Sequence, residues 1–135
     1  MTIQVRRKSD FRLAQTLTID QTSLIVDLSI DDGGDAAGPT PHDLYDSALA
    51  ACKALSVMWY AARKHVPVDD IAVFVDRDGS QERAGAYVLT SRILVGGAVT
   101  DAQLKELLAV AEKCPVHKLM TTVKTTIRTS LDRMA

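Results

Sequence analysis

The sequence predicts an α+β protein with an antiparallel sheet. Short segments that alternate apolar and polar residues predict strands, and two longer segments with apolar residues at helical spacing predict helices. These strands and helices are partly segregated along the chain, which favours α+β over alternating α/β architecture. With 135 residues, of which 47% are apolar and 24% charged, the chain has the size and composition of one globular domain, residues 1–135.

Alternation predicts three strands near the N-terminus, at residues 3–6, 12–19 and 23–30. In the third of these segments, every second residue is a leucine, isoleucine or valine. Asp20 and Gln21 are expected to form a short turn between the second and third strands. The three strands are therefore expected to form an antiparallel meander.

A long helix is predicted after a loop rich in aspartate and glycine at residues 31–39. Thr40 suits the N-cap, Pro41 suits the first helical position, and Asp43 completes a pattern that resembles a capping box. The helix is expected to run to about Lys64 and is apolar around most of its circumference. One small sheet cannot cover such a helix on all sides, so the sequence predicts a homodimer that buries the remaining side.

The second half of the chain is expected to contain two further strands, two helical segments and a closing strand. The strands are predicted at residues 70–76 and 86–95, separated by a turn. Thr100 can cap a helix that Pro115 interrupts, residues 116–121 continue as a helical turn, and residues 125–131 alternate again as a strand.

Charge and hydropathy argue against several classes of partner. The formal net charge is −1, so no basic field is available to attract nucleic acid or an acidic membrane surface. Residues 1–8 lack the apolar segment of a secretory signal, and no apolar run reaches membrane-spanning length without charges. We therefore expect a cytoplasmic location, where cysteines are more often catalytic, metal-binding or inert than permanently cross-linked.

Two cysteines are the main candidates for chemistry. Cys52 lies in the middle of the long apolar helix, and Cys114 directly precedes Pro115, with His117 three residues further on. Both fit the pattern of buried, inert core cysteines, and both fit a redox pair if the fold brings their Cα atoms to within roughly 4.4–6.8 Å. A reactive thiol needs a nearby positive charge, and Lys53, although adjacent to Cys52, occupies a different face of the helix.

A zinc site is a weaker alternative. Cys52, Cys114, His117 and His42 would supply two sulfur and two nitrogen ligands, but only Cys114 and His117 have the close spacing of a ligand pair. Because Gly33-Gly34 is not followed by the lysine and hydroxyl residue of a phosphate-binding loop, no nucleotide site is predicted either. We expect no metal and no cofactor.

Several segments resemble the OsmC/Ohr family, which comprises osmotically inducible protein C and organic hydroperoxide resistance proteins. The runs GPTPHDL at 38–44 and ALAAC at 48–52 are similar to the turn and helix that hold the first cysteine of that family. The run YAARK at 60–64 is typical of the OsmC-like branch, and EKCPVHK at 112–118 is similar to the segment around the second cysteine.

The resemblance implies an intertwined homodimer, with sheets wrapped around paired central helices and sites at the subunit interface. It further implies a thiol peroxidase that needs neither metal nor flavin. Cys52 would be the peroxidatic residue and Cys114 the resolving residue. The substrate would be an organic hydroperoxide, and a small dithiol or a dithiol protein would act as the reductant.

The sequence departs from the family in one respect. Members that are peroxidases keep the thiolate charged with an arginine, which is held by a glutamate on the first turn of the long helix. Here His42 occupies the glutamate position, with Asp43 beside it, and no arginine occurs between Arg12 and Arg63. Arg7 or Arg12 could substitute. The alternative is a non-enzymatic dimer of the same fold that binds a small apolar ligand or senses redox state.

Overall fold

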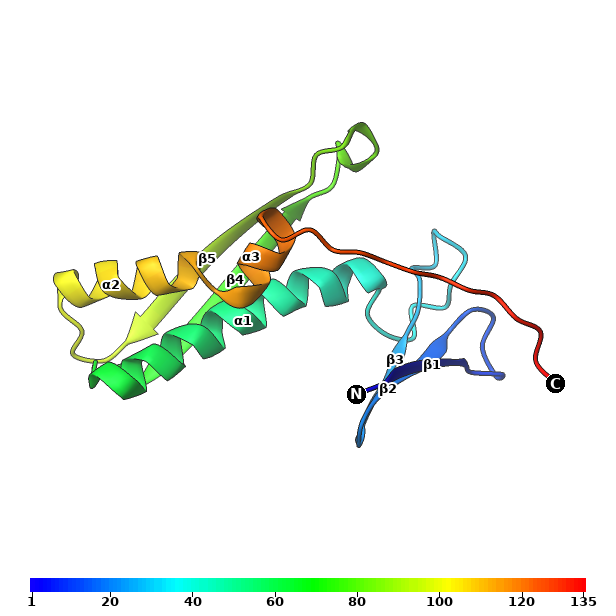
Figure 1. The fold of residues 1–135 in the computed structure, drawn as a ribbon, viewed down its shortest axis with the longest axis horizontal. Helices are drawn as coiled ribbons and strands as arrows, with labels where there is room; N and C mark the ends of the chain where they lie inside the picture. Colours follow the sequence, from blue (N-terminus) through cyan, green and yellow to red (C-terminus); the bar gives the residue numbers. More distant parts are fainter. The chain divides into compact units, whose positions relative to one another are not determined.

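The computed structural model describes all residues, 1–135, and confirms the α+β class (Figure 1). Contacts divide the chain into two compact units, Met1–Ala48 and Leu49–Ala135, which are described separately below. In chain order the elements are β1 (Ile3–Arg7), β2 (Gln15–Ile19), β3 (Thr22–Val26), α1 (Pro41–Lys64), β4 (Asp70–Asp78), the 3₁₀ turn η1 (Glu82–Ala84), β5 (Val88–Gly96), α2 (Asp101–Glu112) and α3 (Pro115–Thr121).

The first unit contains the predicted antiparallel meander, with strand order β1-β2-β3. Leu17 of β2 lies opposite both Val5 of β1 and Leu24 of β3, so apolar residues form a row across the three strands. The turn between β2 and β3 is tight, and Asp20 adopts a positive φ of 50° there. Aspartate tolerates this left-handed conformation better than most residues, which explains why the turn forms at this position.

β3 ends at Val26, earlier than predicted, because Asp27 folds the chain back on itself. The buried Asp27 carboxylate accepts hydrogen bonds from the backbone N–H groups of Leu28, Asp35 and Ala37, at 2.8, 3.1 and 3.1 Å. Three donors on one carboxylate hold the following loop in place of a continued strand. The alternating pattern beyond Val26 therefore does not extend the sheet.

β2 likewise begins later than predicted, at Gln15, because the backbone at Arg12 is bound elsewhere. The Arg12 N–H donates to the Asp35 carboxylate at 3.2 Å, and the guanidinium forms an ion pair with the same carboxylate at 3.2 Å. The guanidinium also donates to the carbonyl of Gly34 at 3.0 Å. Arg12 thus closes the loop of the first unit.

The long helix α1 begins and ends as the sequence predicts. The Thr40 N–H donates to the Asp43 carboxylate at 2.9 Å and the Asp43 N–H donates to the Thr40 hydroxyl at 3.1 Å, which forms the expected reciprocal cap. Arg63 and Lys64 lie in the last turn, and His65 then adopts a left-handed φ of 54° that ends the helix. None of the helices combines the length and hydropathy that crossing a membrane requires.

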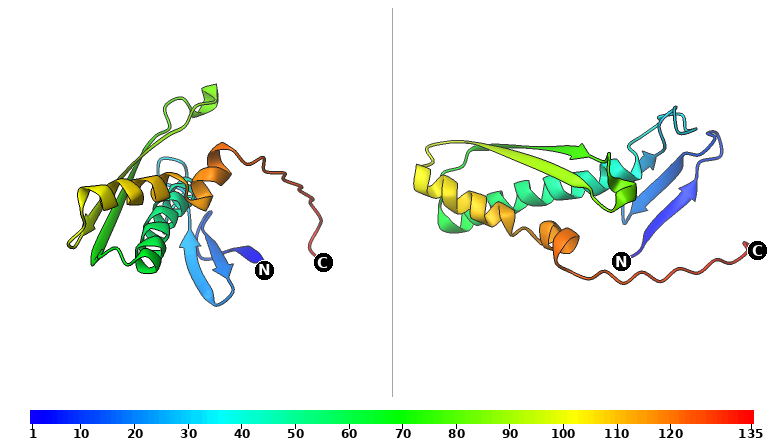
Figure 2. Two further views of the ribbon diagram at one scale, coloured as in Figure 1. Left: turned by 60° about the vertical axis from the view of Figure 1, so that its left-hand side comes forward. Right: turned by 90° about the horizontal axis from the view of Figure 1, so that it is seen from above.

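The second unit has its core where the last turns of α1 meet α2 and the β4–β5 hairpin, which pack side by side in Figures 1 and 2. Its buried residues come from α1, the following loop and α2: Val57, Ala61, Val66, Leu107 and Ala111. Ile71 of β4 and Ile93 and Val95 of β5 pack against them. The two strands pair antiparallel along their whole length. These elements position the candidate site.

α2 begins with the predicted cap. The Gln103 N–H donates to the Thr100 hydroxyl at 3.1 Å, and the Thr100 N–H donates to the Gln103 side chain at 3.0 Å. The loop before it passes through Gly97, whose φ of 115° and close approach to the Pro67 carbonyl leave no room for a Cβ atom.

The predicted closing strand at residues 125–131 is wrong for the single chain. No strand is present beyond α3, and the segment continues as coil (Figure 2). Ile127 is 81% exposed and Leu131 is 96% exposed. A strand forms only where a neighbouring edge supplies hydrogen-bond partners, and this segment pairs with neither sheet. Alternation by itself therefore does not produce a strand here.

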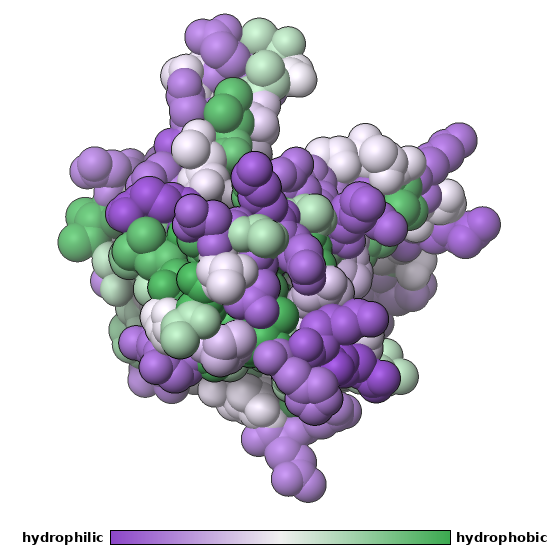
Figure 3. Space-filling model, turned by 90° about the vertical axis from the view of Figure 1, so that its left-hand side faces the viewer, coloured by the Kyte–Doolittle hydropathy of each residue, from purple (hydrophilic) through white to green (hydrophobic).

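Within the second unit, α1 is not covered on all sides. In the second unit its buried face runs through Leu49, Lys53 and Val57, whereas Leu55 is 70% exposed and Trp59 is 60% exposed. Hydrophobic side chains also reach the surface on the side where α1 ends and α2 begins (Figure 3). The homodimer that would cover the exposed face of α1 remains a prediction.

Candidate functional site

Both cysteines belong to the second unit, and both are free thiols. Cys52 is half-buried on α1. Cys114 lies between α2 and α3 and is only 1% exposed. Its extended backbone forms the N-cap of α3, and Pro115 takes the first helical position, which suits a residue without an N–H group. Pro115 therefore fixes the turn that presents Cys114 to the interior.

The structure brings these two thiols together. The Cys52 Sγ accepts the backbone N–H of Val116 at 3.5 Å. The thiol of Cys114 interacts directly with that of Cys52 and receives the backbone N–H of His117. Two successive N–H groups at the start of α3 are thus directed at the two sulfurs. Cys52 also contacts the Ser56 hydroxyl, one turn further along α1, at 3.9 Å.

The environment raises the pKa of the Cys114 thiol above its ordinary value. Burial is the largest cause, and the neighbouring Cys52 thiol acts in the same direction. The His117 N–H and the positive charge of Lys53 oppose it by stabilising the thiolate. Cys114 therefore stays protonated to a higher pH than an exposed cysteine, and Lys53 limits that effect.

Lys53 is the functional candidate that the sequence prediction missed. Its side chain is buried, with 3% exposed. The ammonium donates to the Ala111 carbonyl at 2.8 Å and to His117 Nδ1 at 3.0 Å. Ala111 lies at the C-terminal end of α2, where exposed carbonyl groups favour a cation. A lysine ammonium can only donate, so Nδ1 of His117 is the acceptor in this contact.

Lys53 does occupy a different helix face from Cys52, as predicted, but its long side chain reaches the segment that holds Cys114. The composition of the helix did contain a signal that could have identified Lys53. Lys53 is the single charged residue on α1 between Asp46 and Arg63. A lone charge in an apolar helix is a sign of a specific partner, since lysine is almost never fully buried without one.

Of the remaining predicted site residues, His117 lies beside the thiols and four others belong to the first unit. The imidazole of His117 contacts Lys53, while its backbone N–H serves Cys114. His42 and Asp43 lie in the first turn of α1, Arg7 lies in β1, and Arg12 binds Asp35, all within the first unit. Their support of a thiolate remains a prediction.

The ligand set considered for zinc is not assembled. Its four candidate residues were Cys52, Cys114, His117 and His42. No group of three or more histidine, cysteine, aspartate or glutamate side chains comes together in an arrangement that could hold a metal ion.

An open cavity of about 640 Å³ adjoins Cys114. It is mostly apolar and lies between α1 and the end of α2, lined by Leu55, Trp59, Tyr60, Val110 and Pro115 among others. The Tyr60 hydroxyl donates to Glu106 at 2.9 Å, and this bond raises the pKa of Tyr60. The cavity offers an apolar molecule a route to the buried thiol.

Solved structures with the same fold are similar to this chain over most of its length. An OsmC-like protein from Mycoplasma pneumoniae has a TM-score of 0.73 at 20% identity, covering 90% of this chain and 87% of that one. An organic hydroperoxide resistance protein OsmC from Legionella pneumophila has a TM-score of 0.62 at 17% identity, covering 90% of each chain. The organic hydroperoxide resistance protein OhrB of Bacillus subtilis has a TM-score of 0.57 at 21% identity, covering 90% and 92%.

No curated protein sequence matches the chain significantly. A family model described as OsmC-like protein, by contrast, matches residues 31–130, which include the whole of α1 and both cysteine segments. The chain therefore belongs to the OsmC family.

Proposed function

We propose that the protein is a thiol-dependent peroxidase that reduces organic hydroperoxides to alcohols. The observation that carries the proposal is the meeting of Cys52 and Cys114, two thiols from distant parts of the chain, at the first turn of α3. Each sulfur receives a backbone N–H from that turn, and such donors stabilise negative charge on a thiolate.

In the first step the Cys52 thiolate attacks the terminal oxygen of the hydroperoxide. A sulfur–oxygen bond forms, the oxygen–oxygen bond breaks, and the departing alkoxide takes a proton to give the alcohol. The sulfur is oxidised by two electrons to a sulfenic acid. Cys52 suits this role because it is the more accessible of the two thiols.

In the second step Cys114 attacks the oxidised sulfur. The disulfide forms, the sulfur–oxygen bond breaks, and the hydroxide that leaves is protonated to water. The raised pKa of Cys114 keeps it a protonated thiol while Cys52 reacts with the peroxide, and this suits a resolving residue. A dithiol reductant then restores both thiols by exchange.

Lys53 would supply the positive charge that an arginine provides in the peroxidases of this family. It is buried beside the thiol pair, and its charge lowers the pKa of Cys114. The Ala111 carbonyl and His117 Nδ1 hold its ammonium in place. Both acceptors are neutral, so the positive charge is not cancelled by a carboxylate.

The substrate would be an organic hydroperoxide with a hydrophobic substituent. The cavity beside Cys114 is mostly apolar and includes the exposed Leu55 and Trp59. Burial of an alkyl or aryl group there is favourable, at about 25 cal/mol for each Å² removed from water. Hydrogen peroxide has no such group to bury.

The working form would be a homodimer. Leu55 and Trp59 on α1 and Ile127 and Leu131 beyond α3 are large apolar side chains that the single chain leaves exposed. A second copy would cover these residues and would supply an edge for residues 125–131 to pair with.

Turnover of cumene hydroperoxide with dithiothreitol as reductant tests the proposal. We expect the purified protein to consume the peroxide, Cys52→Ser to abolish turnover, and Ser56→Ala, a change at the hydroxyl that contacts Cys52, to retain most of it. Equal consumption by wild type and Cys52→Ser would refute the proposal.

The non-enzymatic alternative is favoured by the burial of Cys114, which is only 1% exposed. In that case Cys52 would react slowly with iodoacetamide at neutral pH, at the rate of an ordinary thiol, and peroxide would leave both cysteines reduced. Rapid alkylation at pH 6 would favour the peroxidase.

A further inference from the structure

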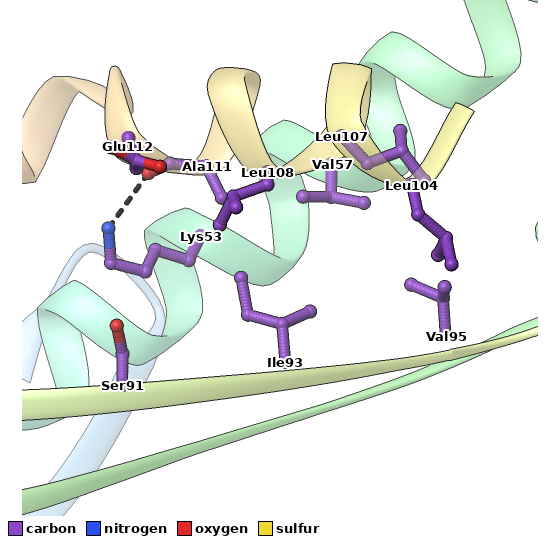
Figure 4. A pocket seen from close by; sticks show the side chains of 10 residues that line it. All are labelled: Lys53, Val57, Ser91, Ile93, Val95, Leu104, Leu107, Leu108, Ala111 and Glu112. Carbon is purple, nitrogen blue, oxygen red and sulfur yellow. Dashed lines mark hydrogen bonds between the residues drawn. The ribbon is translucent and has the colours of Figure 1, made fainter. Parts of the chain in front are cut away.

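A second cavity, of about 250 Å³, lies apart from the thiols between α1, β5 and α2 (Figure 4). Neither cysteine lines it. Its walls are largely aliphatic, formed by Val57, Ile93, Val95, Leu104, Leu107 and Leu108. The cavity is slightly smaller than the ~300 Å³ at which sites for drug-sized ligands begin, so it suits a short or medium aliphatic chain.

The polar groups of this cavity are gathered at one end. Figure 4 shows Lys53 and Ser91 at that end, with Leu104 and Val95 at the other. Glu112 also lines the polar end, but its side chain is exposed to solvent. Lys53 is buried, so its charge is screened much less than that of Glu112. The cavity therefore has an aliphatic part and a positive end.

The ammonium of Lys53 has an unused hydrogen-bond donor. It carries three N–H groups, of which the Ala111 carbonyl and His117 Nδ1 accept two. Both acceptors are neutral, and Lys53 forms no salt bridge. A buried charge without a counter-ion is costly, since the lost hydration is not replaced by an opposite charge. An anion at this end of the cavity would supply both the missing acceptor and the missing charge.

We propose that this cavity binds an aliphatic carboxylate, with the carboxylate on Lys53 and the alkyl chain among Ile93, Leu104 and Leu107. Such a ligand matches the aliphatic walls, the volume and the positive end together. The site shares Lys53 with the proposed peroxide chemistry, but it holds its ligand without either thiol.

Calorimetric titration of the full-length Cys52→Ser protein with octanoate tests this site without thiol redox chemistry. We expect one octanoate per chain, and an affinity that rises about fourfold for each methylene from butanoate to octanoate, as burial of the chain requires. Octanol, which has the chain without the charge, should bind at least tenfold more weakly. Octanoate should shift the methyl resonances of Val57, Ile93 and Leu107.

Two substitutions with opposite expected effects on octanoate affinity identify the end of the cavity that holds the carboxylate. Lys53→Met should weaken octanoate at least tenfold and leave octanol unchanged, whereas the exposed Lys105→Met should change neither. Glu112→Gln should tighten octanoate about twofold to threefold at low ionic strength, and this variant keeps the test available if Lys53→Met does not fold.

Three results would overturn the site: no octanoate binding by folded protein at millimolar concentration, equal affinity for octanoate in Lys53→Met, or no gain in Glu112→Gln. Because binding is measured on Cys52→Ser, a protein that binds octanoate without peroxidase activity in the wild type would refute the proposed function and leave the site standing.

Discussion

Lys53 shows how one buried side chain can connect three parts of the second unit. It extends from α1, donates to the last turn of α2 at Ala111, and donates to His117 of α3. Its positive charge therefore acts at the segment that carries Cys114. Lys53 is therefore a positioning and charge-stabilising residue, since its charge lowers the pKa of Cys114 and its ammonium contacts His117.

Replacing Lys53 by methionine should slow disulfide formation. The substitution keeps the length of the side chain and removes the charge that lowers the pKa of Cys114, so less Cys114 thiolate is present at neutral pH. We expect the step from sulfenic acid to disulfide to slow by roughly tenfold at pH 7 and to regain the wild-type rate at higher pH. Acid-quenched samples analysed by mass spectrometry give this rate, with Lys105→Met as the exposed control. An unchanged rate and pH profile in Lys53→Met would show that its charge does not reach the thiols.

Asp27 has a comparable organising role in the first unit. Although burial, the largest single influence, raises the pKa of its carboxyl, the N–H groups of Ala37, Leu28 and Asp35, together with the charge of Arg12, lower it below the ordinary value. A carboxyl whose pKa is lower in the folded state stabilises the fold above its unfolded pKa, and this contribution is lost as pH falls through the folded pKa.

Asp27→Asn should therefore lower the melting temperature by several degrees at pH 7 and by progressively less below about pH 4, where the wild-type carboxyl takes up a proton. Thermal unfolding, followed by circular dichroism at pH 7 and below about pH 4, measures the difference in melting temperature between wild type and Asp27→Asn. Asp31→Asn in the same loop is an exposed control that should leave the melting temperature unchanged. A loss of stability in Asp27→Asn that is independent of pH would contradict this account.

At the scale of elements, α2 packs on the rest of the second unit through one narrow face. Leu107 is 3% exposed and belongs to the core, whereas its neighbour Leu108 is 56% exposed. Leu107→Ala should cost about 2–5 kcal/mol of unfolding free energy, because it removes buried methyl groups and leaves a cavity. Urea denaturation measures this loss, and Leu108→Ala should cost much less. Equal losses in the two variants would mean that α2 does not pack as described.

Local signals were sufficient to predict most of the elements. The capping pattern at Thr40 and Asp43 and the cap at Thr100 fixed both helix starts, since each is satisfied within three residues along the chain. Alternation located the strands, but the end of β3 and the start of β2 were set by residues with distant partners. Asp27 stops β3 by binding N–H groups eight and ten residues away, a pairing that no local pattern specifies.

The candidate site was predictable only in part for the same reason. Both cysteine segments could be recognised from the sequence, but the contact of Lys53 with Ala111 and His117 spans about half the chain. A helical wheel reports the direction in which Lys53 leaves α1, and it does not report how far a four-carbon side chain reaches. The predicted strand at residues 125–131 failed because the segment pairs with neither sheet of the chain.

At the scale of the whole molecule, the exposed apolar face of α1 predicts self-association. Light scattering after gel filtration should give twice the chain mass of 14.6 kDa. Trp59→Asp should shift the protein towards the single-chain mass, because it places a charge in the expected interface. Met134→Asp, at an exposed position beyond the predicted strand, is the control and should remain dimeric. A wild-type protein of single-chain mass at micromolar concentration would contradict the dimer.

The central claim, that Cys52 and Cys114 exchange electrons with an organic hydroperoxide, is tested most directly by mass spectrometry. Reduced protein is treated with one equivalent of cumene hydroperoxide and digested without reductant. The account predicts a peptide pair joined by a Cys52–Cys114 disulfide in the wild type, and a sulfenic acid on Cys52 that dimedone traps in Cys114→Ser. Two free thiols after the peroxide treatment would contradict it.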